Sequence, residues 1–134
     1  MLHWNFGLAW IAFALALALH AADEAAHGFL DVYNPNALAI RRRLHLPIPV
    51  FTLRAFIIAL SSAVCLLLVL SPLAFHGVGW IRIAAVPISL IAGIFNGLLH
   101  IGSSLFYRRK MAGVLTSPLL LAGGAWLLWS CCRI

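Results

Sequence analysis

The sequence predicts an all-α integral membrane protein, a bundle of four helices that forms one domain over residues 1–134. Hydrophobic residues make up 64% of the chain and charged residues only 9%, whereas about a quarter of the residues in a soluble domain are charged. A water-soluble domain of this size cannot bury so much apolar surface. Four apolar stretches also reach the roughly 20 residues that a membrane-crossing helix needs.

These stretches place the helices at residues 4–29, 51–75, 79–107 and 112–130. None of them alternates between apolar and polar residues as a membrane strand does. Pro87 predicts a kink in the third helix, since proline lacks the amide hydrogen that the helix needs. Gly93, Gly97 and Gly102 give this helix a face of small residues suited to close helix packing.

The connection between the first and second helices, residues 31–49, is expected to be a long loop. Its Asn34-Pro35-Asn36 sequence predicts a turn. Residues 37–46 predict a short basic helix at the membrane surface, with its leucines toward lipid and its arginines toward the headgroups.

The basic residues predict the orientation in the membrane. Seven of the nine lie in or beside the loops that follow the first and third helices: Arg41, Arg42, Arg43, Arg54, Arg108, Arg109 and Lys110. Four crossings put both loops on one side, which the positive-inside rule makes cytoplasmic. We therefore expect a multi-pass protein of a bacterial-type inner membrane, with both termini on the non-cytoplasmic side. Membrane lipids are expected partners. Nucleic acid is not, because the net charge of +6 does not come from a basic face.

All three acidic residues fall within nine positions at the end of the first apolar stretch: Asp23, Glu24 and Asp31. His20, Glu24 and His27 are spaced i, i+4, i+7, so they share one face of a helix, and Asp23 lies beside them. Ionisable groups inside a membrane helix are costly, usually face the bundle interior and usually mark a functional site.

The third helix has a polar pair of its own, Asn96 and His100, at i, i+4. His100 lies seven residues before Tyr107, or roughly 10 Å of helix. His20 lies nine residues before Phe29, or roughly 13 Å. Since both helix ends are expected on the cytoplasmic side, the two polar groups are predicted to meet at one level. The candidate catalytic residues are Glu24, Asp23, His20, His100, Asn96 and His27.

The leading hypothesis is an enzyme that does acid–base chemistry on a lipophilic small molecule, by isomerisation, cyclisation or hydrolysis. Glu24 would donate or relay a proton while His20 orients it, since a histidine–carboxylate pair can hold and move a proton in a dry cavity. Asp23 and His27 would be a second carboxylate and a second base. Asn96 and His100 would hold the substrate or the developing charge. No cofactor is favoured under this hypothesis.

Two alternatives use the same residues. In the first, the chain is a membrane metalloenzyme, because three histidines and a carboxylate suit zinc or non-haem iron. The metal ligands would then be His20, Glu24, His27 and His100. In the second, the chain is a non-catalytic membrane subunit whose polar cluster only holds helices together.

At these residues the sequence resembles the HXXEE family, small four-helix membrane proteins named for a motif that here reads His20-Ala21-Ala22-Asp23-Glu24. Asp23 replaces the first glutamate of the motif. The family's Asn-x-x-x-His matches Asn96 to His100. The resemblance implies the helical membrane fold and assigns the matching polar positions to the family site.

A further block resembles the family's Arg-x-Tyr-x-Pro-Gly, at residues 108–113, followed by Thr116 and Pro118. The tyrosine and the proline of that block are absent here. The His-x-x-x-Glu spacing also looks like that of sterol isomerases and membrane-bound terpene cyclases, which implies acid–base chemistry on lipids.

Overall fold

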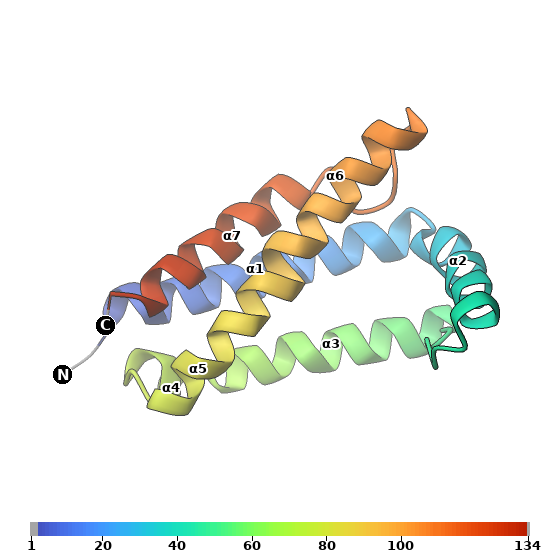
Figure 1. The fold of residues 1–134 in the computed structure, drawn as a ribbon. Helices are drawn as coiled ribbons and strands as arrows, with labels where there is room; N and C mark the ends of the chain where they lie inside the picture. Colours follow the sequence, from blue (N-terminus) through green and yellow to red (C-terminus); the bar gives the residue numbers. More distant parts are fainter. Residues whose placement is uncertain (1–2, 134) are drawn as a thin grey trace.

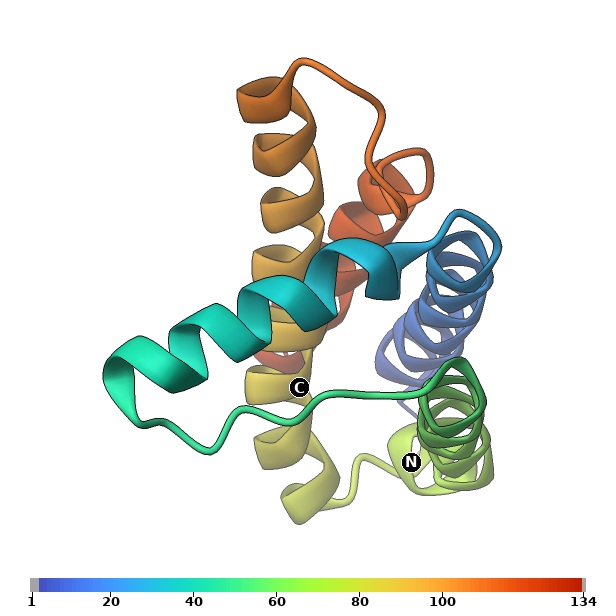
Figure 2. The ribbon, with the colours of Figure 1, turned by 90° about the vertical axis from the view of Figure 1, so that its right-hand side faces the viewer.

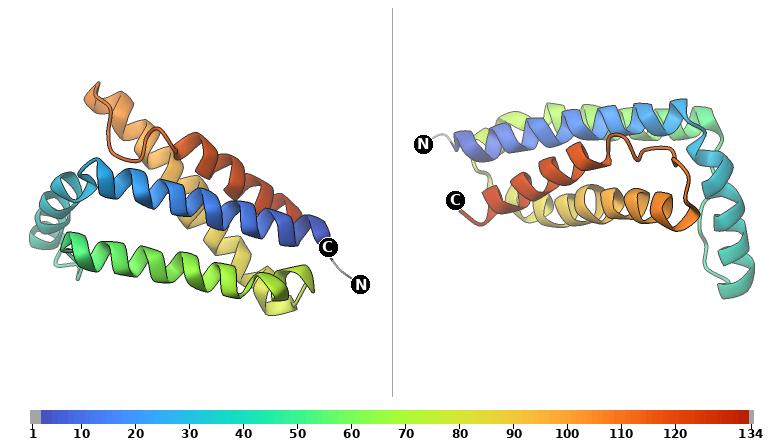
Figure 3. Two further views of the ribbon diagram at one scale, coloured as in Figure 1. Left: turned by 180° about the vertical axis from the view of Figure 1, so that it is seen from behind. Right: turned by 90° about the horizontal axis from the view of Figure 1, so that it is seen from above.

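The computed structural model describes residues 3–133, which contain helices and no β-strand. The all-α prediction is confirmed. In chain order the elements are α1 (Trp4–Ala26), α2 (Phe29–Leu44), α3 (Leu53–Val69), α4 (Ser71–Phe75), α5 (Gly79–Pro87), η1 (Ile88–Phe95), α6 (Asn96–Tyr107) and α7 (Ser117–Cys131). Helices α1, α3, α7 and the continuous α5–η1–α6 run along the molecule, and α2 lies across one end of it (Figures 1 and 3).

Two helices within the described residues are long and apolar enough to cross a membrane. They are Trp4–Ala26, with 23 residues, and Gly79–Tyr107, with 29 residues. The helices α3 and α7 are also apolar but shorter, with 17 and 15 residues.

Helix α1 lies at the centre of the packing, against α7, α3 and α4 (Figure 3). Its buried face carries Phe6, Trp10 and Phe13, at the three- and four-residue spacing that keeps side chains on one side of a helix. The indole Nε1 of Trp10 donates to the Leu67 carbonyl at 2.7 Å, which ties α1 to α3. The outward face of α1 is apolar too, with Leu15 about half exposed. A helix that is hydrophobic all round is typical of the core of a large protein or of a membrane span.

The first helix ends earlier than predicted, at Ala26 instead of residue 29. Gly28 has φ +71°, a left-handed conformation that glycine adopts without steric cost, and the chain turns there into α2. Figure 2 shows α2 leaving the end of α1 and crossing α6.

The prediction of a turn at Asn34-Pro35-Asn36 is wrong, because α2 runs through these residues as far as Leu44. The Asn34 side chain does not close a local turn. Instead, its amide donates to the Phe51 carbonyl at 2.8 Å and its oxygen accepts from the Phe51 amide at 3.0 Å. These two bonds fasten α2 to the start of α3, so a long-range contact replaces the local one that the sequence pattern suggested.

The other predicted helices are also divided differently. The second breaks at Leu70 into α3 and α4, and the fourth begins at Ser117 instead of residue 112. Residues 112–116 therefore form a turn between α6 and α7. In the third helix, the predicted kink site at Pro87 is followed directly by the π-helical segment η1.

Two glycines allow η1 and α7 to come into close contact. A methyl group at Gly93 would lie 2.9 Å from the Cα of Gly124, closer than real side chains approach a backbone. Gly97 likewise faces Leu121 of α7, whereas Gly102 has open space where a side chain would be. The predicted small-residue face is therefore used at Gly93 and Gly97 but not at Gly102.

Replacing Gly93 with alanine should destabilise the protein by about 1–3 kcal/mol, because the added methyl group overpacks the contact with α7. Thermal unfolding in mild detergent would measure this as a lower Tm. Gly102→Ala is the matched control and should leave the Tm unchanged or raise it, since alanine favours helix over glycine. Equal Tm values for the two variants would contradict the close packing of η1 on α7.

Candidate functional site

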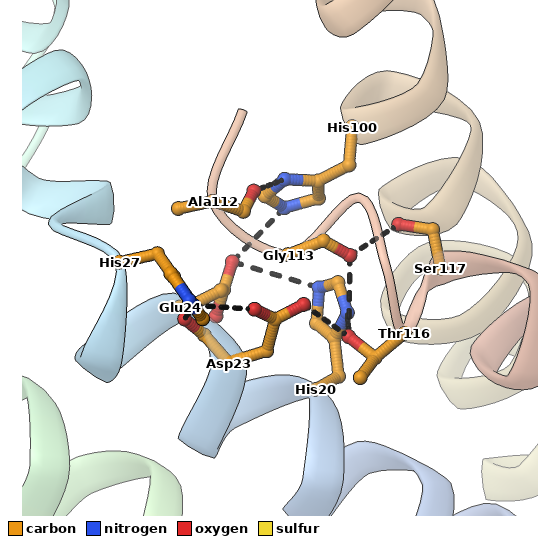
Figure 4. A network of polar contacts seen from close by, with 9 residues as sticks. All are labelled: His20, Asp23, Glu24, His27, His100, Ala112, Gly113, Thr116 and Ser117. Carbon is orange, nitrogen blue, oxygen red and sulfur yellow. Dashed lines mark hydrogen bonds and ion pairs between the residues drawn. The ribbon is translucent and has the colours of Figure 1, made fainter. Parts of the chain in front are cut away.

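The site is centred on the carboxylate of Glu24, which is only 5% exposed in the last turns of α1. Its Oε1 lies 2.9 Å from Nε2 of His100, on α6, and 3.6 Å from Nε2 of His20, one turn earlier on α1 (Figure 4). The two imidazole rings meet edge to face, with their centroids 4.7 Å apart. The polar residues at the end of the first helix and His100 of the third predicted helix, which were expected at the same depth, are therefore in contact.

The opposite nitrogen of His100 fixes the position of one proton. Its Nδ1 lies 2.6 Å from the carbonyl oxygen of Ala112. A carbonyl oxygen can only accept a hydrogen bond, so Nδ1 carries the hydrogen and donates it. In the neutral ring, Nε2 is then the unprotonated nitrogen, and it faces Glu24.

The same reasoning applies to His20. Its Nδ1 lies 3.0 Å from Thr116 Oγ1, which itself lies 2.9 Å from Asp23 Oδ2 and 3.2 Å from the Gly113 carbonyl oxygen. The threonine hydroxyl has one hydrogen, and the carboxylate and the carbonyl are both acceptors. Thr116 therefore donates to one of them and accepts from Nδ1 of His20. The Nε2 atom of neutral His20 is again unprotonated.

Both Nε2 lone pairs and one carboxylate oxygen thus converge on one point. The hydrogen bond between His100 and Glu24 accommodates a single shared proton. Nε2 of His20 is buried and has no hydrogen-bond partner in the described part of the chain. The 3.6 Å to Glu24 Oε1 is an ion-pair distance when the ring is protonated, but it is too long for a good hydrogen bond. A buried polar atom without a hydrogen bond costs free energy and needs an explanation, such as an ion or a strained functional group.

These three atoms match the ligand set of a metal ion. They come from His20, Glu24 and His100, the group among residues 3–133 that could hold one, and all lie within 4.8 Å of one another. A tetrahedral zinc ion with bonds of about 2.0–2.1 Å keeps its ligands about 3.3 Å apart. The two separations from Glu24, 2.9 and 3.6 Å, lie on either side of this value, and the two histidine nitrogens lie within 4.8 Å of each other, so the rings would adjust to close around an ion. Metal-bound histidines commonly donate their other N–H to a carbonyl or a carboxylate, as both rings do here directly or through Thr116.

His27 does not join this group, which differs from the four-ligand set predicted from the sequence. Helix α1 ends at Ala26, and the His27 side chain is 59% exposed, with its Nδ1 2.7 Å from Asp23 Oδ1. The i, i+7 spacing holds only along an unbroken helix, and the helix stops one residue too early. Asp23 supports His20 through Thr116 and does not face the converging atoms.

Asn96 lines a cavity of about 910 Å³ between α2 and α6, and His100 forms part of the same wall. The Phe29 ring lies 5.5 Å from the His100 ring, measured between centroids. The cavity therefore gives access to the cluster from the His100 side. His20, which is 0% exposed, is closed off.

The turn between α6 and α7 supplies three residues to which the sequence analysis gave no role: Ala112, Gly113 and Thr116. Gly113 has φ +82°, and a methyl group there would lie 2.8 Å from Nδ1 of His100 and 2.9 Å from Cε1 of His20. Only glycine fits between the rings. The signal that could have found these residues is the second block of the family resemblance, which includes Gly113 and Thr116.

The fold and the site define a class: an all-helical protein with a buried His–Glu–His cluster backed by a glycine turn. The family model described as "Protein of unknown function with HXXEE motif" matches residues 10–127. The chain therefore belongs to the HXXEE family, as the sequence motif indicated. No curated protein and no solved structure matches the chain.

Thr116→Val should destabilise the protein by about 1–3 kcal/mol, because the Nδ1 hydrogen of His20 and the Oδ2 atom of Asp23 would both lose their hydrogen bond to the hydroxyl. Thr116→Ser keeps the hydroxyl and should retain most of the stability. Thermal unfolding of both variants in detergent would measure the difference. If the serine variant were as unstable as the valine variant, the threonine methyl group and not the hydroxyl would be the important contact.

Proposed function

We propose that this protein is a membrane metalloenzyme that binds one divalent transition-metal ion, zinc or ferrous iron, through His20, Glu24 and His100. The observation that supports this most directly is Nε2 of His20, buried without a hydrogen-bond partner and directed at Glu24. A buried ring nitrogen without a hydrogen bond lowers the stability of the protein unless something binds it. Two histidines and one carboxylate are the ligand set of catalytic zinc sites and of non-haem iron sites.

The number of ligands favours catalysis over a structural role. Structural zinc sites have four protein ligands, whereas catalytic sites have three and leave a position for water or substrate. The cluster offers three, and the cavity beside His100 leads to it. A bound metal would activate water or polarise a substrate oxygen at that position. Asn96, in the same cavity wall, is placed to contact a substrate.

The second candidate is a metal-free acid–base enzyme, the hypothesis that the sequence favoured. The observation behind it is the 2.9 Å separation of Glu24 and His100, which is a hydrogen-bond distance. One shared proton on that bond could be passed to a substrate in the cavity. In both candidates the substrate is a lipophilic small molecule that reaches the site from the membrane.

We also propose that the chain is a multi-pass protein of a bacterial-type inner membrane, a four-helix bundle in which α3 and α7 cross together with the two longer helices. The charge distribution supports this. Arg54 lies in the first turn of α3, at the end that α2 covers, and Arg108 follows α6 at the same end (Figure 1). Arg82 and Arg133 lie at the other end, where Arg82 donates to the Cys131 carbonyl. The end rich in arginine would be cytoplasmic.

Metal analysis tests the leading candidate. Untagged protein, purified in mild detergent without chelator and dialysed against zinc or ferrous iron, should hold about one metal ion per chain. Glu24→Gln and His100→Ala should each lose most of the metal, because each removes a ligand. His45→Ala, an exposed histidine in the connection after α2, is the control and should retain it.

Folded wild-type protein that takes up neither metal would overturn the metalloenzyme and leave the acid–base candidate. Under that candidate, Glu24→Gln remains folded and loses activity, since glutamine cannot carry the shared proton. If both variants unfolded at low temperature and neither activity nor metal were found, the cluster would be purely structural.

The orientation is tested by C-terminal fusions in a bacterial host. Alkaline phosphatase fused after Ile134 should be active, and green fluorescent protein at the same place should be dark, because the C-terminus is expected outside the cytoplasm. The same reporters fused after Lys110 should give the reverse result. Equal results at the two positions would contradict the proposed crossing between them.

A further inference from the structure

The cavity beside His100 has the size of a small-molecule site, about 910 Å³, within the usual range of roughly 300–1,000 Å³. Its apolar wall comes from α2 and α6, with Phe29, Val32, Ile40 and Leu99. A second hollow of about 480 Å³ adjoins it, since Leu99 and Ser103 line both. The remainder of that hollow is almost entirely apolar: Phe95, Leu98, Gly102, Phe106 and Tyr107.

Two cations also line the cavity, Arg109 and Lys110. The turn that carries them is held against α6, because the Arg109 amide donates to the Ser104 carbonyl at 3.2 Å and the Met111 amide donates to Ser104 Oγ at 2.9 Å. The Arg109 guanidinium carbon lies 5.9 Å from the centre of the Tyr107 ring, which lines the second hollow. Arg109 therefore lines the first cavity and lies near a residue that lines the second.

One acidic residue also lines the cavity, so its Arg, Lys and Asp side chains together carry one net positive charge. Asp31 is the one acid in the cavity wall, and it lies in the first turn of α2. A carboxylate there is stabilised by the positive end of the helix dipole. His27 is also in the wall, and its ring nitrogen is already paired with Asp23.

We propose that this cavity binds an anionic amphiphile, with its carboxylate or phosphate at Arg109 and Lys110 and its apolar chain in the hollow along α6. An arginine offers paired N–H donors that match either anion, and lysine adds a point charge. The hollow along α6 lies on an exposed apolar face, which in a membrane would face lipid. The head of the ligand would then lie at the basic end of the bundle and its chain in the bilayer.

This inference deepens the proposed function, because such a ligand would have its polar portion beside His100, where the proposed chemistry occurs. Binding itself does not require the metal. Arg109 and Lys110 would select the ligand by its charge, and the cluster would act on it. The two claims can therefore fail separately.

The test is native mass spectrometry of the full chain in mild detergent, titrated with three probes that share an oleoyl chain: lysophosphatidate, oleate and neutral monoolein. We expect both anionic probes to bind about tenfold more tightly than monoolein, the effect of one or two hydrogen bonds to charged groups. The tighter of the two identifies the head as phosphate or carboxylate. Monoolein binding as tightly as both anions would overturn the proposal.

Charge variants locate the binding. Arg109→Gln with Lys110→Gln should weaken both anionic probes about tenfold and leave monoolein unchanged. Arg42→Gln with Arg43→Gln is the control, because it removes the same charge from α2 without touching the cavity wall. An equal loss in both double variants would mean general attraction to a basic surface and would overturn the proposal.

A third variant separates the two claims. Glu24→Gln should lose the metal and keep the preference for anionic probes, because Glu24 is a proposed metal ligand that does not line the cavity. A protein that binds no metal but keeps this preference would overturn the metalloenzyme and leave the amphiphile site standing. A protein that binds metal but shows no preference for anionic probes would overturn the amphiphile site and leave the metalloenzyme standing.

Discussion

The burial of one carboxylate, that of Glu24, determines the arrangement of the rest of the structure. Removing an ionised carboxylate from water costs several kcal/mol unless other groups pair with it. His20, one turn earlier on the same helix, lies 3.6 Å from this carboxylate. At that distance His20 is not a sufficient partner on its own. The closer partner is His100 of α6, at 2.9 Å. The end of α1 must therefore lie against α6.

That contact requires a third segment, because two histidine rings directed at one carboxylate need partners for their outer nitrogens. The turn of residues 112–116 provides them, with the Ala112 carbonyl for one ring and Thr116 for the other. It fits between the rings because Gly113 has no side chain and has φ +82°. Ser117 Oγ donates to the Gly113 carbonyl at 2.8 Å, so the first residue of α7 holds the turn in place. The linker between two helices is thus part of the site.

The features that could be predicted from the sequence are those that depend on residue spacing along a single helix. The helical class, the pairing of His20 with Glu24, and the level of His100 all follow from spacing and from counted rise. Prediction from the sequence failed where a long-range contact replaces a local one, as where Asn34 bonds to Phe51 instead of closing a turn and α2 runs on through Pro35. It also missed the Ala112 carbonyl, since a backbone oxygen has no signature in the sequence. Thr116 was visible only as part of a motif.

The two histidines are not equivalent, and this difference bears on what the cluster can do. His20 is 0% exposed and enclosed by α1 and the turn, so an incoming molecule cannot reach it without a rearrangement. His100 is 7% exposed and forms part of the cavity wall. The edge that His100 and Glu24 share is therefore the accessible side of the cluster, with His20 as the fixed partner behind it. The proposed metal ion and the proposed shared proton would be alternative occupants of this edge, because each would satisfy the same lone pairs. A metal ion would also satisfy Nε2 of His20, which has no hydrogen bond among the described residues. Without a metal, a protonated His20 would instead form an ion pair with Glu24 across 3.6 Å.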